Sequence, residues 1–388
     1  MDTIANVAYT IAFALTATGF DLFFLSPPEV LRMTATENCL LVSDIRAQTV
    51  PLGATAIVAS IHLFSNAHSD FVVHSFGRSN NHTCSVWDNT VYEADSYLND
   101  VLLTSEGGCC CGYCSTSFYG NAHGTIIIPL LPDGSFQAAL AMGFDEGTHY
   151  ITIQVYGYFT GPFILPQQSV YNLRTNTSAI DQTVDLDALV PAGATAVLGG
   201  LSSFISDQND FFATSLGRFG NHSAQVWGME AYDTNETLND QLIFHEGGVD
   251  GPMTYHFGHS HGSVLVPLSP DGSYSMMTNI GKRAPEPDAV ADSFAYLTNQ
   301  IFGYLPGEQY TNVRFFPHDE IQKIRFSFQQ TEYTLTDNTV PGLPVDAVAI
   351  LCNVFTYNVP DNNDHMTHTF GRNPAHNAYF GLVYDSVS

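Results

Sequence analysis

The chain repeats a block of sequence, and the third copy of that block is shorter than the first two. The copies open at Val50, Val190 and Leu343 with VPLGATAIVASIHLF, VPAGATAVLGGLSSF and LPVDAVAILCNVFTY. A repeat unit buries its apolar surface only when it is complete. A shortened copy therefore requires a partner, either another part of the chain or another molecule, unless the sequence is a window on a longer repeat protein.

The first two copies stay in register over most of a domain. Gly77-Arg78 matches Gly217-Arg218, and Leu98-Asn99-Asp100 matches Leu238-Asn239-Asp240, in each case 140 residues on. Later matches include PDGSF with PDGSY and YITIQVYGYFTG with YLTNQIFGYLPG. Matches spread over a whole unit with few gaps indicate a true duplication.

Each unit reads as β-strands. Runs such as TAIVASIHLF and GTIIIPLL are rich in Val, Ile, Phe and Thr, and Pro-Asp-Gly and other Gly-rich turns separate them. No segment resembles a capped amphipathic helix. We predict an all-β fold of tandem β-sandwich repeats, two complete and one incomplete, with a jelly-roll or immunoglobulin-like topology left open.

The predicted organisation alternates sandwiches and linkers. It comprises an N-terminal closing or donor strand (1–19), a linker (20–49), repeat 1 (50–161), a linker (162–189), repeat 2 (190–307), a linker (308–342) and partial repeat 3 (343–388).

The N-terminal segment supplies a candidate for the strand that copy three lacks. YTIAFALTATG at 9–19 aligns with ITIQVYGYFTG at 151–161, so that Thr10 matches Thr152 and Gly19 matches Gly161. The predicted polymerisation strand is centred on Tyr9, Ile11, Phe13 and Leu15. This strand could close copy three within one molecule, or close that of a neighbour and build a head-to-tail filament. Reading 4–26 as a strand also disfavours a membrane span, which its length alone would permit.

The charge balance limits the classes of partner that the protein can bind. Eleven Lys and Arg face 38 Asp and Glu, giving a formal net charge of -27, while only 13% of residues are charged. Such a surface repels nucleic acid and anionic membranes, so we expect neither as a partner. A polar surface that is rich in Thr, Ser and Asn and poor in basic residues is common in extracellular proteins, and we expect an extracellular or cell-surface location.

The cysteines and the N-glycosylation sequons also favour an extracellular protein. The chain holds seven Cys, a count that favours disulfides over a zinc site with only one CxxC-like half. The disulfide candidates are Cys39, Cys84, Cys109, Cys110, Cys111, Cys114 and Cys352. The candidate N-glycosylation sites are Asn81, Asn176, Asn221 and Asn235, two of which share one position in the repeat.

A repeated Asp and Arg suggest a structural ion pair. Asp70 and Arg78 recur as Asp210 and Arg218 and again as Asp364 and Arg372. We interpret them as an Asp–Arg pair that fixes a loop to a strand end, rather than as a ligand site. A His four residues after each Arg is interpreted as a hydrogen-bonded loop histidine.

Metal and catalytic signals are weak. His256, His259 and His261 could ligate zinc or copper, but the first copy keeps only His123 of this set, so no metal site is predicted. The acidic loops at 68–70, 207–210 and 361–365 leave Ca²⁺ as a possible ligand, and no other cofactor is expected. No nucleophile, phosphate-loop or metalloprotease motif is present, so we predict no enzyme activity.

Taken together, these features favour an extracellular structural protein that forms a homopolymeric filament by β-strand complementation. The alternatives are a cell-surface adhesin or carbohydrate-binding module, and a virion or fibre protein. The expected partners are copies of the chain itself, with glycans as possible covalent attachments.

Overall fold

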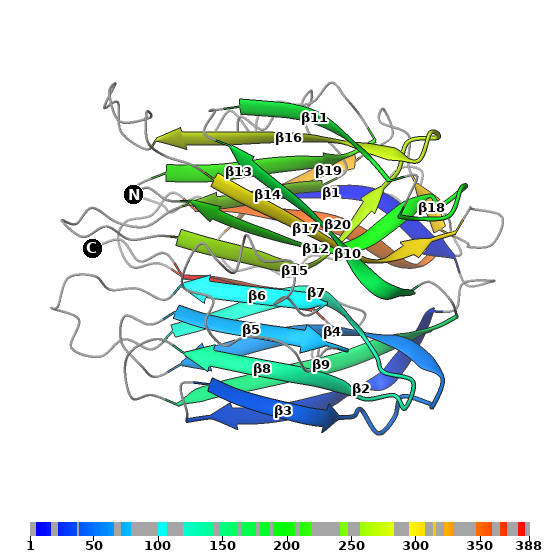
Figure 1. Ribbon diagram of the computed structural model, residues 1–388. Helices are drawn as coiled ribbons and strands as arrows, with labels where there is room; N and C mark the ends of the chain where they lie inside the picture. Colours follow the sequence, from blue (N-terminus) through cyan, green and yellow to red (C-terminus); the bar gives the residue numbers. More distant parts are fainter. Residues whose placement is uncertain are drawn as a thin grey trace, which may run out of the picture.

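The protein is an all-β molecule built from antiparallel sheets (Figure 1). The computed structural model describes residues 5–16, 22–36, 39–65, 71–78, 100–106, 119–142, 148–161, 164–175, 179–186, 189–205, 210–218, 241–246, 257–282, 295–306, 313–315, 322–328, 347–358, 365–370 and 379–384. Within these ranges every regular element is a strand, and none is a helix long and apolar enough to span a membrane. The predicted all-β class is confirmed.

Eight consecutive strands form the first group, unit 1, which is blue to cyan in Figure 1. They are β2 (Leu22–Ala35), β3 (Cys39–Ile45), β4 (Ala54–Ser65), β5 (Phe71–Gly77), β6 (Val101–Glu106), β7 (Tyr119–Pro129), β8 (Phe136–Met142) and β9 (His149–Thr160).

The next eight strands form unit 2, green to yellow in Figure 1. They are β10 (Ile164–Thr175), β11 (Ala179–Asp185), β12 (Ala196–Ile205), β13 (Asp210–Gly217), β14 (Gln241–Glu246), β15 (Phe257–Pro267), β16 (Ser273–Lys282) and β17 (Ala295–Leu305).

The remaining strands come from both ends of the sequence and form unit 3. They are β1 (Ala5–Thr16), β18 (Val313–Phe315), β19 (Gln322–Phe328), β20 (Ala347–Asn358), β21 (His365–Phe370) and β22 (Tyr379–Tyr384).

Units 1 and 2 share one strand order, which decides the topology that the sequence left open. Numbering the strands of a unit from 1 to 8, unit 1 pairs them as 1-8-3-6 (β2-β9-β4-β7) and 2-7-4-5 (β3-β8-β5-β6). Unit 2 gives the same two orders, β10-β17-β12-β15 and β11-β16-β13-β14. Two four-stranded sheets with this order form a jelly roll.

All three segments that we expected to be linkers contain strands of the sandwiches. Residues 308–342 hold β18 and β19, which pair with β1. Residues 20–49 contain β2 and β3, which pair with β9 and β8, and 162–189 contain β10 and β11, which pair with β17 and β16. Prolines explain the misreading: Pro27, Pro28 and Pro166 coincide with register shifts that interrupt β2 and β10. The linker assignment was therefore wrong for these strands, whereas the other domain boundaries stay a prediction.

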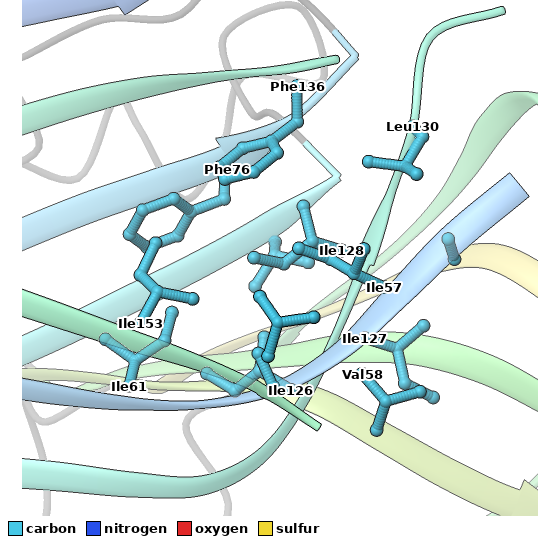
Figure 2. Packing of buried hydrophobic residues seen from close by; sticks show 14 of the residues in the cluster. Ile57, Val58, Ile61, Phe76, Ile126, Ile127, Ile128, Leu130, Phe136 and Ile153 are labelled. Carbon is cyan, nitrogen blue, oxygen red and sulfur yellow. The ribbon is translucent and has the colours of Figure 1, made fainter. Parts of the chain in front are cut away.

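The core of unit 1 lies between its two sheets (Figure 2). Phe76 of β5 and Phe136 of β8 are fully buried and meet edge to face, with ring centroids 6.5 Å apart. Ile61 of β4 and Ile153 of β9 face them from the other sheet. In unit 2 the places of the two Phe rings are taken by Leu216 and Tyr274, also fully buried. Compared with unit 1, unit 2 therefore has a smaller residue on β13 and a larger residue on β16.

Shortening Ile61 by one methylene tests this packing. Ile61→Val should lower the free energy of unfolding by about 0.5–1.5 kcal/mol, because the side chain is fully buried. Leu41→Val on β3, where the residue is 58% exposed, should change it by less than about 0.5 kcal/mol. Urea unfolding followed by fluorescence measures both, and equal effects would contradict the assigned core.

The repeated Pro-Asp-Gly turns form, but they lead from one sheet to the other, from β7 to β8 and from β15 to β16, and do not close the hairpins that we expected. In unit 1 Asp133 accepts hydrogen bonds from the Ser135 N–H (3.0 Å) and hydroxyl (2.6 Å), while Gly134 adopts φ 81°. Asp271, Ser273 and Gly272 repeat this arrangement, with φ 83° at Gly272. The Ser hydrogen bonds lower the pKa of both Asp carboxyls. The left-handed conformation favours Gly, which explains why the tripeptide recurs.

Glu29 of β2 fixes the turn that leads from β3 to β4. Its carboxylate accepts hydrogen bonds from the N–H groups of Gln48 (2.7 Å) and Thr49 (2.8 Å) and from the Thr49 hydroxyl. Burial alone would raise the pKa of Glu29, but these hydrogen bonds outweigh it and lower the pKa.

Stability should therefore depend on the charge of Glu29. A lowered folded-state pKa means that the contribution is present above the unfolded-state pKa and is lost as the pH falls through the folded-state value. Glu29→Gln should lower the free energy of unfolding by about 1 kcal/mol at pH 7, and the difference in this free energy between variant and wild type should narrow below about pH 4.5. Thermal unfolding against pH measures this. Asp44→Asn, at an exposed neighbouring position, serves as the control, and a gap independent of pH would contradict the assignment.

Candidate functional site: strand pairing between units

The sheets of one unit continue into the next at two junctions. Strand 6 of unit 2, β15, pairs with strand 5 of unit 1, β6, at Ser260 and Thr104. Strand 6 of unit 1, β7, pairs with β22 of unit 3 at Ala122 and Leu382. β22 takes the place of strand 5, since it pairs with β21 as β6 pairs with β5. The result is an eight-stranded sheet and a six-stranded sheet that each cross a unit boundary.

Both junctions use the same register. Ala122 and Ser260 occupy the same place in strand 6, since each lies directly before a His-Gly pair. On the other side, Thr104 pairs with Val73 within unit 1, and Leu382 pairs with Thr367 within unit 3. Val73 and Thr367 each lie three residues after the repeated Asp, at Asp70 and Asp364. The junction is therefore a repeated structural feature and not a single chance contact.

The N-terminal strand lies inside unit 3 of its own chain. β1 pairs along one side with β20 and along the other with β18 and β19. Of the two arrangements that the sequence allowed, the structure shows closure within one molecule. Exchange of β1 between molecules, as the filament hypothesis requires, stays a prediction.

β1 takes the place that strand 8 has in the other units, including its irregularities. In unit 1, Val155 pairs with Ala59 and Gly157 with Val58, so Tyr156 is skipped. In unit 3, Ile11 pairs with Cys352 and Phe13 with Leu351, so Ala12 is skipped. Unit 2 has the same shift between Ile301 and Gly303.

This register corrects the alignment made from sequence. We aligned Thr10 with Thr152, but Thr10 pairs with Asn353, as Gln154 pairs with Ser60 in the equivalent place. The true offset is two residues larger than the one inferred from the shared Thr and Gly. The skipped Ala12 also means that Ile11 and Phe13 pair with consecutive residues of β20, Cys352 and Leu351, so the two-residue alternation is interrupted between Tyr9 and Ile11 on one side and Phe13 and Leu15 on the other.

Arg78 of the Gly-Arg pair forms an ion pair with Asp100, an acid that we did not assign to it, while the predicted pairing with Asp70 lies outside the described residues and stays a prediction. Arg78 donates to Asp100 from Nε (3.0 Å), from a terminal guanidinium nitrogen (2.8 Å) and from its backbone N–H (2.8 Å). The Asp100 side chain is 5% exposed and that of Arg78 is 18% exposed. This bidentate pair joins the end of β5 to the start of β6, where Gly77 adopts φ 145°, a conformation that favours Gly.

The sequence held the signal for Asp100. Leu98-Asn99-Asp100 repeats at the same spacing of 140 residues as the Gly-Arg pair, so Asp240 is the expected partner of Arg218. Gly217 repeats the backbone conformation of Gly77 with φ 148°. We paired Arg78 with Asp70 instead because that Asp recurs in all three copies, whereas the Leu-Asn-Asp block recurs in two.

Many of the predicted site residues lie outside the described ranges or are described by backbone alone. His259 and His261 lie on β15, Cys39 on β3, Cys352 on β20 and Asp210 on β13. Within the described residues no group of three His, Cys, Asp or Glu is placed to hold a metal ion. Outside the described ranges lie His256, Asp70, Asp364, Arg372, Asn81, Asn176, Asn221, Asn235, Cys84, Cys109, Cys110, Cys111 and Cys114. Disulfides, glycosylation and Ca²⁺ binding stay predictions.

Comparisons with known proteins do not assign the chain to a family. No model of a protein family matches the sequence, and no curated protein matches it. Among solved structures, the chain is similar to the major capsid protein P2 of bacteriophage PM2, at 9% identity and a TM-score of 0.26, with 77% of this chain and 97% of that chain covered. It is also similar to infectious bursal disease virus (11% identity, TM-score 0.20, 78% and 72% covered) and to an archaeal virus protein described as a triple jelly roll (9%, 0.21, 79% and 80%). Likeness at this level carries no functional argument, and the strand orders and registers above remain the basis for the proposal.

Proposed function

We propose that the protein is a structural subunit that assembles into a multimeric particle or fibre of the virion kind. The observation that carries this proposal is the repeated junction, in which sheets run from one unit into the next at one register. Such pairing makes several jelly rolls into one block, which is what a building element needs and a flexible multidomain receptor does not.

An exposed apolar surface on unit 1 supports association of such blocks. Phe23 and Val30 of β2 are each 46% exposed, and Tyr150 of β9 is 48% exposed. Phe23 stacks on Tyr158 with ring centroids 5.1 Å apart, so the aromatic surface extends across both strands. Because β2 is also the edge strand of its sheet, this surface is accessible to a neighbouring molecule.

Electron microscopy of the purified protein, with light scattering against concentration, tests the proposal. We expect particles or fibres well above the 42.3 kDa of one chain. Val30→Asp should reduce assembly, whereas Leu41→Asp, at an exposed position on β3, should leave it intact. A folded protein that stays monomeric at all concentrations would overturn the proposal.

The shape seen by microscopy also separates the two forms of assembly. A filament that is lost when residues 1–16 are removed, and that does not return when a free peptide of residues 1–19 refolds unit 3, would favour strand exchange. Particles or fibres formed while β1 remains paired with β20 of its own chain would favour association through the outer surfaces. An extracellular location and attached glycans are further parts of the proposal, and mass spectrometry of native material would detect the glycans.

A further inference from the structure

Two strand edges in the described part of the chain have a partner on one side only. β14 pairs with β13, and β20 pairs with β1, and neither pairs with a further described strand. In the other units the equivalent edges are both covered by strand 6. β4 pairs with β7, which pairs with β22, and β12 pairs with β15, which pairs with β6.

The two edges face each other at the spacing of one strand position. Cα atoms of β14 and β20 come within 8 Å of each other at a few positions. β12 and β6, which flank β15, approach to the same degree, and so do β4 and β22, which flank β7. Neither β14 nor β20 contains Lys, Arg or Pro, the residues that commonly protect a strand edge from pairing.

We infer that the position between β20 and β14 accepts an extended segment of strand-6 type that belongs to none of the described strands. The repeated registers define how that segment would pair. Phe355 of β20 occupies the place of His62, and Phe244 of β14 occupies the place of Thr104 and Leu382. The residue equivalent to Ala122 or Ser260 would therefore lie between Phe355 and Phe244, antiparallel to both strands.

The same registers define the sequence of the partner. In both known cases the junction residue is followed by His-Gly, a small hydroxyl residue, three apolar residues and Pro. The register shifts at the Gly in both, between Ala59 and Ile61 and between Gly199 and Leu201. A second copy of this chain could supply β7 or β15 only by breaking two ladders, so a separate strand of this pattern is the occupant that fits.

A synthetic peptide with the sequence of 117–132, SFYGNAHGTIIIPLLP, tests the inference directly. The peptide carries Ala122→Cys, and the full chain carries Phe244→Cys or, separately, Phe355→Cys. Opposed residues in antiparallel strands have Cα atoms about 4.5–5.5 Å apart, within the range that a disulfide spans. We expect both chain variants to cross-link to the peptide, with the bonds located by mass spectrometry so that native cysteines are distinguished.

The control variant is His245→Cys, one residue further along β14. Because successive residues of a strand alternate between its two faces, this variant should cross-link at least about tenfold less than Phe244→Cys. A second control peptide with Ile126→Asp and Ile128→Asp should bind more weakly, because these residues are buried where the parent sequence forms β7. Equal cross-linking at 244 and 245, or no binding of the parent peptide to the folded chain, would overturn the inference. Either result would leave the assembly proposed above untouched, since that is read out by particle formation without the peptide.

Discussion

Removing residues 1–16 should unfold unit 3 while leaving unit 1 folded. β1 is the central strand of its sheet, so its loss leaves β18, β19 and β20 without the strand that joins them. We expect a loss of more than about 5 kcal/mol in the stability of unit 3, a size that single surface changes do not reach. Hydrogen exchange with mass spectrometry should show lost protection in 322–328 and 347–358 and retained protection in 54–65.

Adding the missing strand back provides the control. A peptide of residues 1–19 should restore protection of β20, whereas the same peptide with Ile11→Pro should not, because proline cannot donate to the ladder in a central strand. Undiminished protection of β20 in the truncated chain would show that β1 is not its partner. The experiment thereby also measures how readily the strand can be exchanged between molecules.

The second large effect is expected at the ion pair that joins β5 to β6. Asp100→Asn removes the charge that compensates a mostly buried Arg78, and breaking such a pair costs about 3–5 kcal/mol. Urea unfolding of the variant should show this as a shift of the midpoint. Asp240→Asn should cost a similar amount if the second Leu-Asn-Asp block pairs with Arg218 in the same way.

An exposed pair elsewhere in unit 1 gives the matched control. Arg46 and Asp133 also form an ion pair, but their side chains are 44% and 51% exposed. Arg46→Gln should therefore cost no more than about 1 kcal/mol. If Asp100→Asn and Arg46→Gln had equal effects, the burial of the Arg78–Asp100 pair would not be what stabilises it.

Local chemistry explains which parts of the fold were predictable. Pro-Asp-Gly predicts its turn because Asp133 and Gly134 satisfy the turn by themselves, whereas the sheets that β7 and β8 join on either side of it depend on distant strands. Runs of β-branched residues predict strands for the same reason. Errors arose where the partner was distant: Pro27 and Pro28 suggested a linker, although β2 continues past them because β9 pairs on both sides of the interruption.

In the candidate site, too, local features were predictable from the sequence and contacts with distant residues were not. The repeated Arg78 was recognised, but its ion pair with Asp100 was not, because that contact joins residues on two different strands and depends on where the chain returns at the start of β6. Similarly, the match between β1 and the closing strand was found two residues out of register. Shared Thr and Gly letters determined that alignment, whereas the skipped residue Ala12 determines the actual pairing.

By itself, the sequence determined that the chain is all-β, that it is duplicated, and that its N-terminal strand belongs with its last copy. These follow from residue patterns that are local or that recur along the chain. Only the tertiary structure decided the jelly-roll order, the closure of unit 3 by β1 of the same molecule, and the junctions at Ala122 and Ser260. A strand's sequence specifies which face is apolar, but both of its edges carry the same backbone groups, so its neighbours are chosen by the packing of the whole molecule.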